Sequence, residues 1–449
     1  MNDIKYNYKY LILISLTTAM GGLLFGYDIS VISGTIPFIT DYFSLDEYTK
    51  GVVVSSLYIG CMVGVLFAGR FSDKYGRRKI LMLSAILLAI SSIGSGLATS
   101  LTSFFIYRIV GGLGVGMASI LSPMYIAEVA PEKHRGAFVT LNQLTVVIGM
   151  LMAYVVNYLL LKIGDNSWRY MLAAMGVPSI LFFIGMFFVP ESPRWLLHNG
   201  FSEKAKHIFY RMGGDLYVKQ AQDSFLEEKN NVKTVDKKSI YKTLKKVKWI
   251  VVIGSILCFL QQWSGINTIF FYAPDIFAKT GVGIDSQLGQ SIFLGAINVL
   301  FTLVAMRLTD RLGRKPLLII STAGMGIVYI LLGLLFYFNN LEGFGVLILC
   351  MMAVALYAIG LAPLTWVVVS EIFPNRIRGL AMSITSFALW VGCYLLTLTF
   401  PMLMKWLSGS GTFWLYAIIC CSGALFIAKC IPETKGKTLE EIEKIVITK

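Results

Sequence analysis

Three side-chain amides, Gln261, Gln262 and Asn267, lie within one long apolar stretch of the sequence. An amide in hydrocarbon needs a hydrogen-bond partner or water, because burying it unpaired costs about 2–7 kcal/mol. On a regular helix Gln262 and Asn267 would lie about 140° apart, since successive residues turn by about 100°. They face one polar cavity only if the helix opens at Ser264 and Gly265, as helices that line water-filled sites do. The alternative is a polar seam between packed helices.

Two charged residues also lie inside apolar runs, Asp28 in the first run and Arg108 near the start of the fourth. A charge at the centre of a membrane helix costs about 2.5–3.5 kcal/mol on insertion scales, so it usually has a partner or serves a transport pathway. Two interpretations stay open. The side chains form a permanent ion pair, or the ionisation of Asp28 depends on conformation, because burial and a nearby arginine act on it in opposite directions.

Other reactive residues form no recognisable site. The seven cysteines contain no C-x-x-C motif and lie mainly in apolar runs, which is typical of small core side chains. The three histidines, His134, His198 and His207, are too scattered for a metal site. We find no arrangement of a nucleophile with a base and no phosphate-binding loop, so the sequence predicts neither an enzyme nor a bound cofactor or metal.

The composition indicates a polytopic membrane protein. Of 449 residues, 56% are apolar and only 14% are charged, against about 25% charged in soluble domains. The net charge of +14 does not predict nucleic-acid binding, because the basic residues lie between apolar runs rather than in a stripe with aromatics. The first apolar run, from Tyr10 to about Ile39, is too long for a signal peptide and is expected to be the first transmembrane helix.

Apolar windows of about 20 residues predict twelve spans, near 10–38, 50–69, 80–99, 101–130, 136–162, 168–189, 249–277, 285–308, 316–338, 343–372, 378–403 and 411–431. Basic residues gather in the loops after spans two and eight, so the positive-inside rule places both termini in the cytoplasm. We therefore expect a six-helix bundle in 1–189, a cytoplasmic linker with short helices in 190–248, a second bundle in 249–431 and a cytoplasmic tail in 432–449. The basic run Lys237 to Lys248 is either a lipid-headgroup contact or a solvated linker.

The chain repeats itself at an offset of about 240 residues. The stretch Asp73 to Lys79 returns as Asp310 to Lys315, Glu128 with Arg135 returns as Glu371 with Arg378, and Pro190-Glu191 returns as Pro432-Glu433. An offset of six helices returns the second half in the orientation of the first. Such parallel repeats place a binding site between the halves, near the middle of the bilayer.

Together these motifs resemble the sugar porters of the major facilitator superfamily, which include proton-coupled xylose and glucose symporters and facilitative glucose transporters. The matching stretches are Gly69-Arg70 through Lys79 and its repeat, Arg108 to Gly112, Pro190 to Arg194, Gln261 to Asn267, and Pro432 to Gly436. The resemblance implies an all-α polytopic membrane protein with the major facilitator fold, in which twelve transmembrane helices form two pseudo-symmetric six-helix bundles. It also implies a monomeric secondary transporter of the cell membrane that imports a monosaccharide, a pentose or hexose, by proton symport with alternating access.

The resemblance implies a set of substrate-binding residues: Gln143, Gln261, Gln262, Asn267, Asn298, Trp366 and Trp390. Side-chain amides both donate and accept hydrogen bonds, as sugar hydroxyls do, and indole faces cover apolar C–H surfaces. It also implies that Asp28 takes up the proton and loosens its hold on Arg108. A charge network that holds the outward-open state is implied for Arg70, Arg77, Glu128 and Glu191 with Arg314, Glu371, Arg378 and Glu433.

Four positions depart from familiar members of this family. Leu389 stands where an Asn or Gln usually contacts sugar, Phe271 replaces a Tyr, Ala362 replaces a Gly, and Met150 replaces a Gln of the xylose symporters. Losing one partner of a polar ligand costs about 1–3 kcal/mol, so these changes leave the identity of the sugar open.

Three other functions remain compatible with the sequence. A facilitative uniporter keeps everything except the proton coupling. A non-transporting sugar sensor shares the fold, although such proteins often carry a long cytoplasmic tail. Transport of a drug or an anion is less favoured, because an anion site would contain basic groups.

Overall fold

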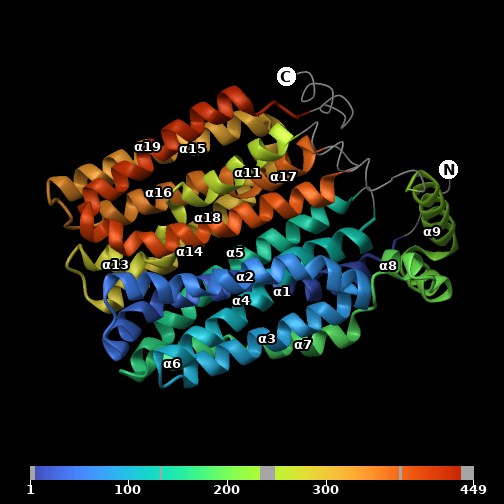
Figure 1. Ribbon diagram of the computed structural model, residues 1–449, viewed down its shortest axis with the longest axis horizontal. Helices are drawn as coiled ribbons and strands as arrows, with labels where there is room; N and C mark the ends of the chain where they lie inside the picture. The colour runs from blue at the N-terminus through green and yellow to red at the C-terminus, as the bar shows by residue number, and fades with distance from the viewer. Residues whose placement is uncertain (1–5, 132–133, 233–247, 374–376, 436–449) are drawn as a thin grey trace.

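The computed structural model describes residues 6–131, 134–232, 248–373 and 377–435. Within this part of the chain, twelve helical segments are long and apolar enough to cross a membrane. Their positions confirm the predicted spans, and the helices run side by side along the long axis of the molecule (Figure 1).

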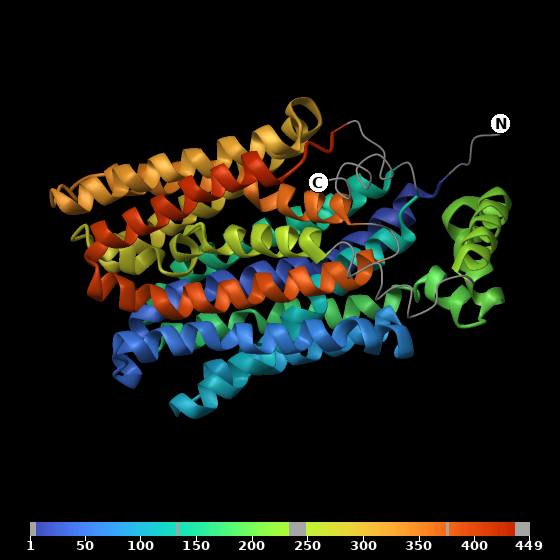
Figure 2. The same ribbon diagram turned by 45° about the horizontal axis from the view of Figure 1, so that its top comes forward.

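The N-terminal half contains the first six spans. They are α1 (Tyr8–Phe43), α2 (Glu47–Tyr75), α3 (Arg77–Leu97), α4 (Leu101–Val129), α5 (Arg135–Leu160) with the short 3-10 helix η2 (Leu161–Ile163), and the pair α6 (Ser167–Ala174) and α7 (Gly176–Phe188). Two further helices follow, α8 (Pro193–His198) and α9 (Ser202–Val232). The α9 helix bends at Gly213 and Gly214, and both helices lie beyond one end of the bundle (Figures 1 and 2).

The C-terminal half contains the other six spans. They are α11 (Lys248–Trp263) continued by α12 (Ile266–Phe271) and α13 (Ala273–Ala278), then α14 (Ile284–Leu312), α15 (Arg314–Tyr337), α16 (Gly345–Ile359) continued by α17 (Leu361–Ile372), α18 (Arg378–Trp406) and α19 (Ser408–Cys430). We call the end of the bundle that carries α8 and α9 the α9 end, and the opposite end, with the α1–α2 turn and α13, the Lys50 end (Figure 1). Helices α8 and α9 lie within the stretch 190–248. The basic run lies outside the described residues from Lys237 to Lys246, and its last member, Lys248, begins α11.

Glycine allows close packing between α2 and α4. A Cβ atom added to Gly64 of α2 would lie 2.6 Å from the carbonyl oxygen of Leu113 on α4, and Gly60 of α2 faces Gly112 of α4. Small residues at a helix interface let two backbones approach, because membrane helices associate mainly through van der Waals packing. This seam brings α2 close to α4, and it sets the position of the α2 side chains described below.

Candidate functional site

The seventh span opens where the amides lie. The α11 helix ends at Trp263, α12 begins at Ile266, and Gly265 between them has φ of 85°. Glycine adopts this left-handed conformation without the steric cost that a Cβ imposes. The break brings the two amides together, and Asn267 Nδ2 donates a hydrogen bond to Gln262 Oε1. The opening expected from the sequence is therefore present.

The neighbouring amide, Gln261, has a structural contact in this conformation. Its Nε2 donates to the carbonyl oxygens of Leu361 at 2.9 Å and Ala362 at 3.1 Å. These residues begin α17 just after Gly360, where the tenth span is interrupted at φ of −130° and ψ of −79°. Carbonyl groups at the start of a helix already have intrahelical donors, and Thr365 Oγ1 also donates to that of Leu361, so Gln261 adds a further bond to them from another span. The two broken spans are thus held together by the amide of Gln261.

Aromatic rings from both halves surround this amide pair. Trp390 on α18 has its ring centroid 5.6 Å from that of Phe25 on α1 and 6.0 Å from that of Tyr58 on α2. Tyr58 also lies 5.8 Å from Phe271, which ends α12. Rings at these separations attract one another beyond the area they bury. An aromatic layer therefore joins the two halves beside the amide pair.

The other residues expected at the site are distributed as follows. Asn298 on α14 is 3% exposed and its Nδ2 lies 3.6 Å from Met150 Sδ on α5. Gln143 is half-buried two turns before Met150 on α5, and Trp366 on α17 is 36% exposed. Leu389 is buried beside Trp390. The structure thus brings Gln262, Asn267 and Trp390 together, holds Asn298 against the opposite half, and leaves the Trp366 ring more open.

A tyrosine from the N-terminal half completes the backbone bonding of the broken span. The carbonyl of Phe270 has no α-helical donor, because the residue four positions later is Pro274, which lacks an N–H group. The hydroxyl of Tyr154 on α5 donates to this carbonyl at 2.9 Å. A buried carbonyl without a partner is costly, so this bond stabilises the conformation in which the two halves meet here.

The buried ion pair lies within the N-terminal half. Arg108 Nη1 on α4 donates to Asp28 Oδ1 on α1, and the side chains are 2% and 1% exposed. Asp28 Oδ2 and the Nε and Nη2 groups of Arg108 have no hydrogen-bond partner among the described residues. Leaving part of a buried charge unpaired is expensive. The pair is therefore incompletely satisfied by the described residues.

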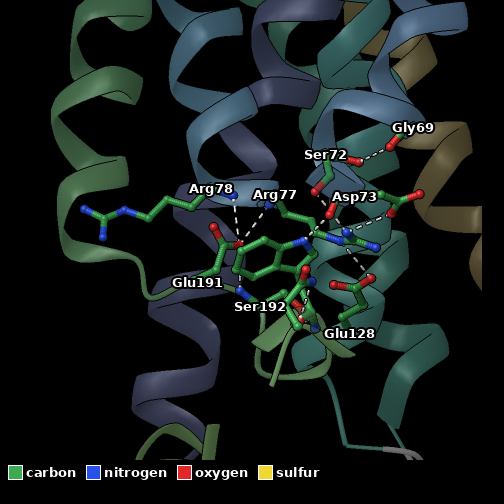
Figure 3. Close-up of polar contacts among 10 residues, drawn as sticks. Gly69, Ser72, Asp73, Arg77, Arg78, Glu128, Glu191 and Ser192 are labelled. Carbon is green, nitrogen blue, oxygen red and sulfur yellow. Dashed lines mark hydrogen bonds and ion pairs between the residues drawn. The ribbon is translucent and has the colours of Figure 1, made fainter. Parts of the chain in front are cut away.

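At the α9 end of the N-terminal half, Arg77 forms the centre of a charge cluster (Figure 3). Arg77 Nε lies 3.2 Å from Glu128 Oε1, and its Nη1 lies 2.9 Å from Asp73 Oδ1. Glu191 Oε1 accepts the backbone N–H groups of Arg77 at 2.9 Å and Arg78 at 3.1 Å. Since Gly76 precedes α3 without a capping side chain, Glu191 caps this helix from a distant part of the chain.

The C-terminal half repeats this arrangement. Arg314 Nη2 lies 3.4 Å from Glu371 Oε1. Glu433 accepts the backbone N–H groups of Arg314 at 3.1 Å and Lys315 at 3.0 Å, and Gly313 before α15 has φ of 90°, close to the 98° of Gly76. The repeated sequence motif therefore builds the same helix cap twice.

The two capping carboxylates differ in their ionisation. Burial raises the pKa of Glu191, and its backbone donors do not fully offset that effect. Burial also acts to raise the pKa of Glu433, but the backbone N–H groups of Lys435, Arg314 and Lys315 outweigh it and hold the pKa below its usual value. Glu433 is the more firmly ionised of the two.

Two residues of the expected network stand apart from these clusters. Arg70 is exposed on α2 and forms no ion pair with the rest of the described chain. Arg378 begins α18, but its side chain lies outside the described residues. Among the side chains that are described, the ion pairs of the network each join residues of one half.

Contacts between the halves lie toward the Lys50 end. Lys50 Nζ on α2 is 3.5 Å from Asp275 Oδ2 on α13, and it also lies 3.4 Å from Glu47 Oε2 on its own helix. A Cβ on Gly295 of α14 would lie 3.0 Å from Leu151 on α5. The two bundles are thus joined at this end, and the ion pairs described at the α9 end do not cross between them.

Comparison with known proteins identifies the family. The family model for "Sugar (and other) transporter" matches residues 14–446, nearly the whole chain. The chain belongs to the sugar transporter family. Members of this family are transporters rather than enzymes, and the resemblance inferred from the motifs is confirmed.

Two relatives of this sugar transporter cover almost its full length. The D-xylose-proton symporter of Escherichia coli (strain K12) is 40% identical over 479 residues, covering 98% of this chain and 96% of its own. The arabinose-proton symporter of Bacillus subtilis (strain 168) is 39% identical over 450 residues, covering 99% and 96%. The solved inward open conformation of the xylose transporter XylE from E. coli matches with a TM-score of 0.86 at 38% identity, over 97% of this chain and 100% of that chain.

Sequence reasoning did not identify Phe25, Tyr58, Tyr154 and Cys393, all of which lie at the site. Asn267 Nδ2 is 3.9 Å from Cys393 Sγ, and the aromatic residues contact the other half. Phe25 was within reach of inference, because it lies three residues before Asp28 on the same helix. Tyr154 was also within reach, since Pro274 leaves the Phe270 carbonyl without a donor. For Tyr58 and Cys393 no sequence pattern signals the contact.

Proposed function

We propose that this sugar transporter imports a monosaccharide, a pentose or a hexose, together with a proton by alternating access. The observation that carries the proposal is the incompletely bonded Asp28–Arg108 pair buried in one half, near an uncharged site of amides and aromatic rings. The names of the xylose-proton and arabinose-proton symporters support the substrate class and the coupling ion.

The α9 end faces the cytoplasm in this proposal, and the protein works as a monomer in the plasma membrane. The basic residues Arg70, Arg77, Arg78 and Arg314 lie at the α9 end, in agreement with the positive-inside rule. The structure is then an inward-facing state. The contacts between halves at the Lys50 end and the likeness to the inward open xylose transporter support this assignment.

In the proposed cycle, Asp28 takes a proton at Oδ2 from the outer side while the carrier is outward-open. Neutral Asp28 holds Arg108 less strongly, and the loaded halves then rock to the inward-facing state. Release of sugar and proton inside restores the ion pair. The Asp28 carboxylate can take up a proton in this cycle because its buried charge is only partly compensated. The charge clusters of Arg77 and Arg314, with Arg70 and Arg378, would hold the outward-open state by pairing across the halves.

Gln262, Asn267, Asn298, Gln143, Trp366 and Trp390 are the residues we propose to contact the sugar. In the inward-facing state the first two amides bond to each other, so the sugar hydroxyls would replace this bond. Gln261 would contribute its side-chain amide oxygen, Oε1, because its Nε2 already donates to the Leu361 carbonyl at the start of α17. Met150 lies against Asn298. A Gln at position 150 would offer the sugar one more hydrogen-bond partner, so Met150 would change which sugar is preferred.

Replacement Asp28→Asn tests the proposal. We expect the variant to lose uphill accumulation of sugar in proteoliposomes under an inward proton gradient, because Asn does not titrate. It should keep sugar exchange at equal pH on both sides. Undiminished accumulation by the variant would refute the role of Asp28.

The wild-type protein distinguishes the remaining functions. Alkalinisation of the medium on addition of sugar, with a panel of pentoses, hexoses and polyols, identifies both symport and substrate. Saturable uptake without proton movement would identify a facilitative uniporter. Sugar binding without any uptake would identify a sensor.

A further inference from the structure

The proposed coupling requires a physical link between two sites that lie in different halves. Asp28 and Arg108 belong to α1 and α4, whereas Gln262 and Asn267 belong to α11 and α12. Two sites are coupled only through an element whose arrangement both of them influence. The residues between them are therefore candidates for the link.

Tyr58 of α2 contacts the sugar site in three ways. Its ring stacks on Trp390 with an interplanar angle of 27° and lies against Phe271. Its hydroxyl is within hydrogen-bonding reach of the Cys393 thiol, and Cys393 Sγ lies 3.9 Å from Asn267 Nδ2. The side chain is 2% exposed. Tyr58 thus reaches from the N-terminal half to the amide pair of the other half.

The buried ion pair lies close to the same stretch of α2. A Cβ on Gly111 of α4, three residues after Arg108, would lie 3.4 Å from Asp28 Oδ2, and one on Gly112 would meet the carbonyl oxygen of Leu57, the residue before Tyr58. The glycine seam between Gly60 and Gly112 brings α2 this close to α4. Phe25 also touches Trp390, but its ring has no hydroxyl with which to respond to a change in charge.

We propose that Tyr58 is the positioning residue that transmits the ionisation state of Asp28 to the sugar site. When Asp28 accepts a proton at Oδ2, Arg108 is freed from its carboxylate partner and turns an N–H group to the Tyr58 hydroxyl oxygen. The hydroxyl then leaves the Cys393 thiol, and the ring shifts against Trp390 and Phe271. When Asp28 loses the proton, Arg108 returns to the carboxylate and the Cys393 contact re-forms. Only the proton on Oδ2 and hydrogen bonds change, so no other reactant is needed.

The inference rests on the proposed function and is tested with Tyr58→Phe, which removes the hydroxyl and keeps the ring. Tyr329→Phe is the matched control, because Tyr329 is also fully buried, in the C-terminal half, and its hydroxyl has no hydrogen-bond partner among the described residues. Sugar exchange, proton-driven accumulation and the pH dependence of exchange are measured for both variants in proteoliposomes.

We expect Tyr58→Phe to lower the ratio of proton-driven accumulation to exchange by about tenfold, within the range typical of coupling between sites. The pH dependence of its exchange should flatten, a change that a purely packing role would not produce. Tyr329→Phe should behave as the wild type.

Two results would overturn the inference. One is a Tyr58→Phe variant with the accumulation and pH profile of the wild type. The other is an equal loss of exchange and accumulation, which would place the hydroxyl in sugar binding rather than coupling. Failure of the wild-type protein to accumulate sugar under a proton gradient would instead contradict the proposed function itself, so the two failures are distinguishable.

Discussion

Glu191 and Glu433 occupy equivalent places in the two repeats, yet they differ in how their environments treat the charge. Each accepts hydrogen bonds from backbone N–H groups at the start of a helix. The residue before that helix is a glycine, which has no side chain to cap it. A negative charge at such a place is stabilised by the helix dipole. Burial outweighs this effect at Glu191 and not at Glu433. The duplicated motif therefore keeps the geometry of the cap while the ionisation of the capping residue differs.

Glu433→Gln should lower the thermal unfolding midpoint in detergent at neutral pH. The expected loss is about 0.3–1 kcal/mol, the range for a charge at an exposed helix terminus. Because the pKa of Glu433 is lowered on folding, its stabilising charge is present above the ordinary pKa of a glutamate and is lost as pH falls through the lowered value. The difference between variant and wild type should therefore shrink in acid.

Glu342→Gln is the control for this measurement, because Glu342 is an exposed loop residue. A loss of equal size at neutral and acidic pH would show that Glu433 acts through packing rather than charge.

The residue types at the site were readable from the sequence, whereas their partners were not. The amides, Asp28 and Arg108 stand out because polar groups in apolar runs are costly. The bonds from Gln261 to the start of α17 depend on how two interrupted helices, about 100 residues apart, cross in space. The same is true of Tyr58, since an aromatic residue within an apolar helix gives no signal of the partner it contacts.

The elements that matter most are the interrupted spans. Hydropathy predicted their existence and approximate limits, and the amide spacing predicted the opening at Gly265. The interruption of the tenth span at Gly360 was not predicted, since a single glycine inside an apolar run is also common in continuous membrane helices. It depends on tertiary contacts, including the bond from the Leu361 N–H group to Ser321 Oγ at 3.1 Å.

Gly265→Ala tests the role of the opening in the seventh span. The alanine would have to keep the positive φ of Gly265, and its Cβ would lie 2.7 Å from the Tyr416 ring. We expect a loss of stability of about 1 kcal/mol or more. We also expect weaker sugar binding, because Gln262 and Asn267 would no longer share one face. Sugar affinity and the unfolding midpoint are measured together.

Gly281→Ala is the matched control. Gly281 also has a positive φ, of 78°, but open space surrounds the position of its Cβ. Gly281→Ala should lose stability only through the strained positive φ, and it should keep the affinity for sugar. Equal affinities of the two variants would argue against a binding role for the opening.

At the scale of the whole molecule, the two bundles are joined across the Lys50 end by few polar contacts among the residues that the structure describes. Lys50 is only 12% exposed at its side chain, and its partner Asp275 belongs to the other half. The Lys50–Asp275 pair is therefore one of the polar links that hold the two halves together at this end.

Lys50→Met should shift the population toward states in which the Lys50 ends of the halves separate. The expected shift is up to about fivefold, because ion pairs near a surface contribute about 0–1 kcal/mol. Spectroscopic distances between labels at the Lys50 ends of the two halves measure the change. Lys162→Met is the control, since Lys162 is an exposed lysine of η2, between α5 and α6, and forms no ion pair with the described residues. An unaltered distance distribution in Lys50→Met would exclude a role for this ion pair.

The bond from Tyr154 to the Phe270 carbonyl carries a consequence for every transport cycle. Pro274 removes the only helical donor for that carbonyl, so separation of the halves there exposes an acceptor that nothing in its own span satisfies. Solvent must enter to replace the phenol each time this end opens. Osmotic stress, which withdraws such solvent, would therefore favour the closed arrangement and slow turnover even when sugar and proton are abundant.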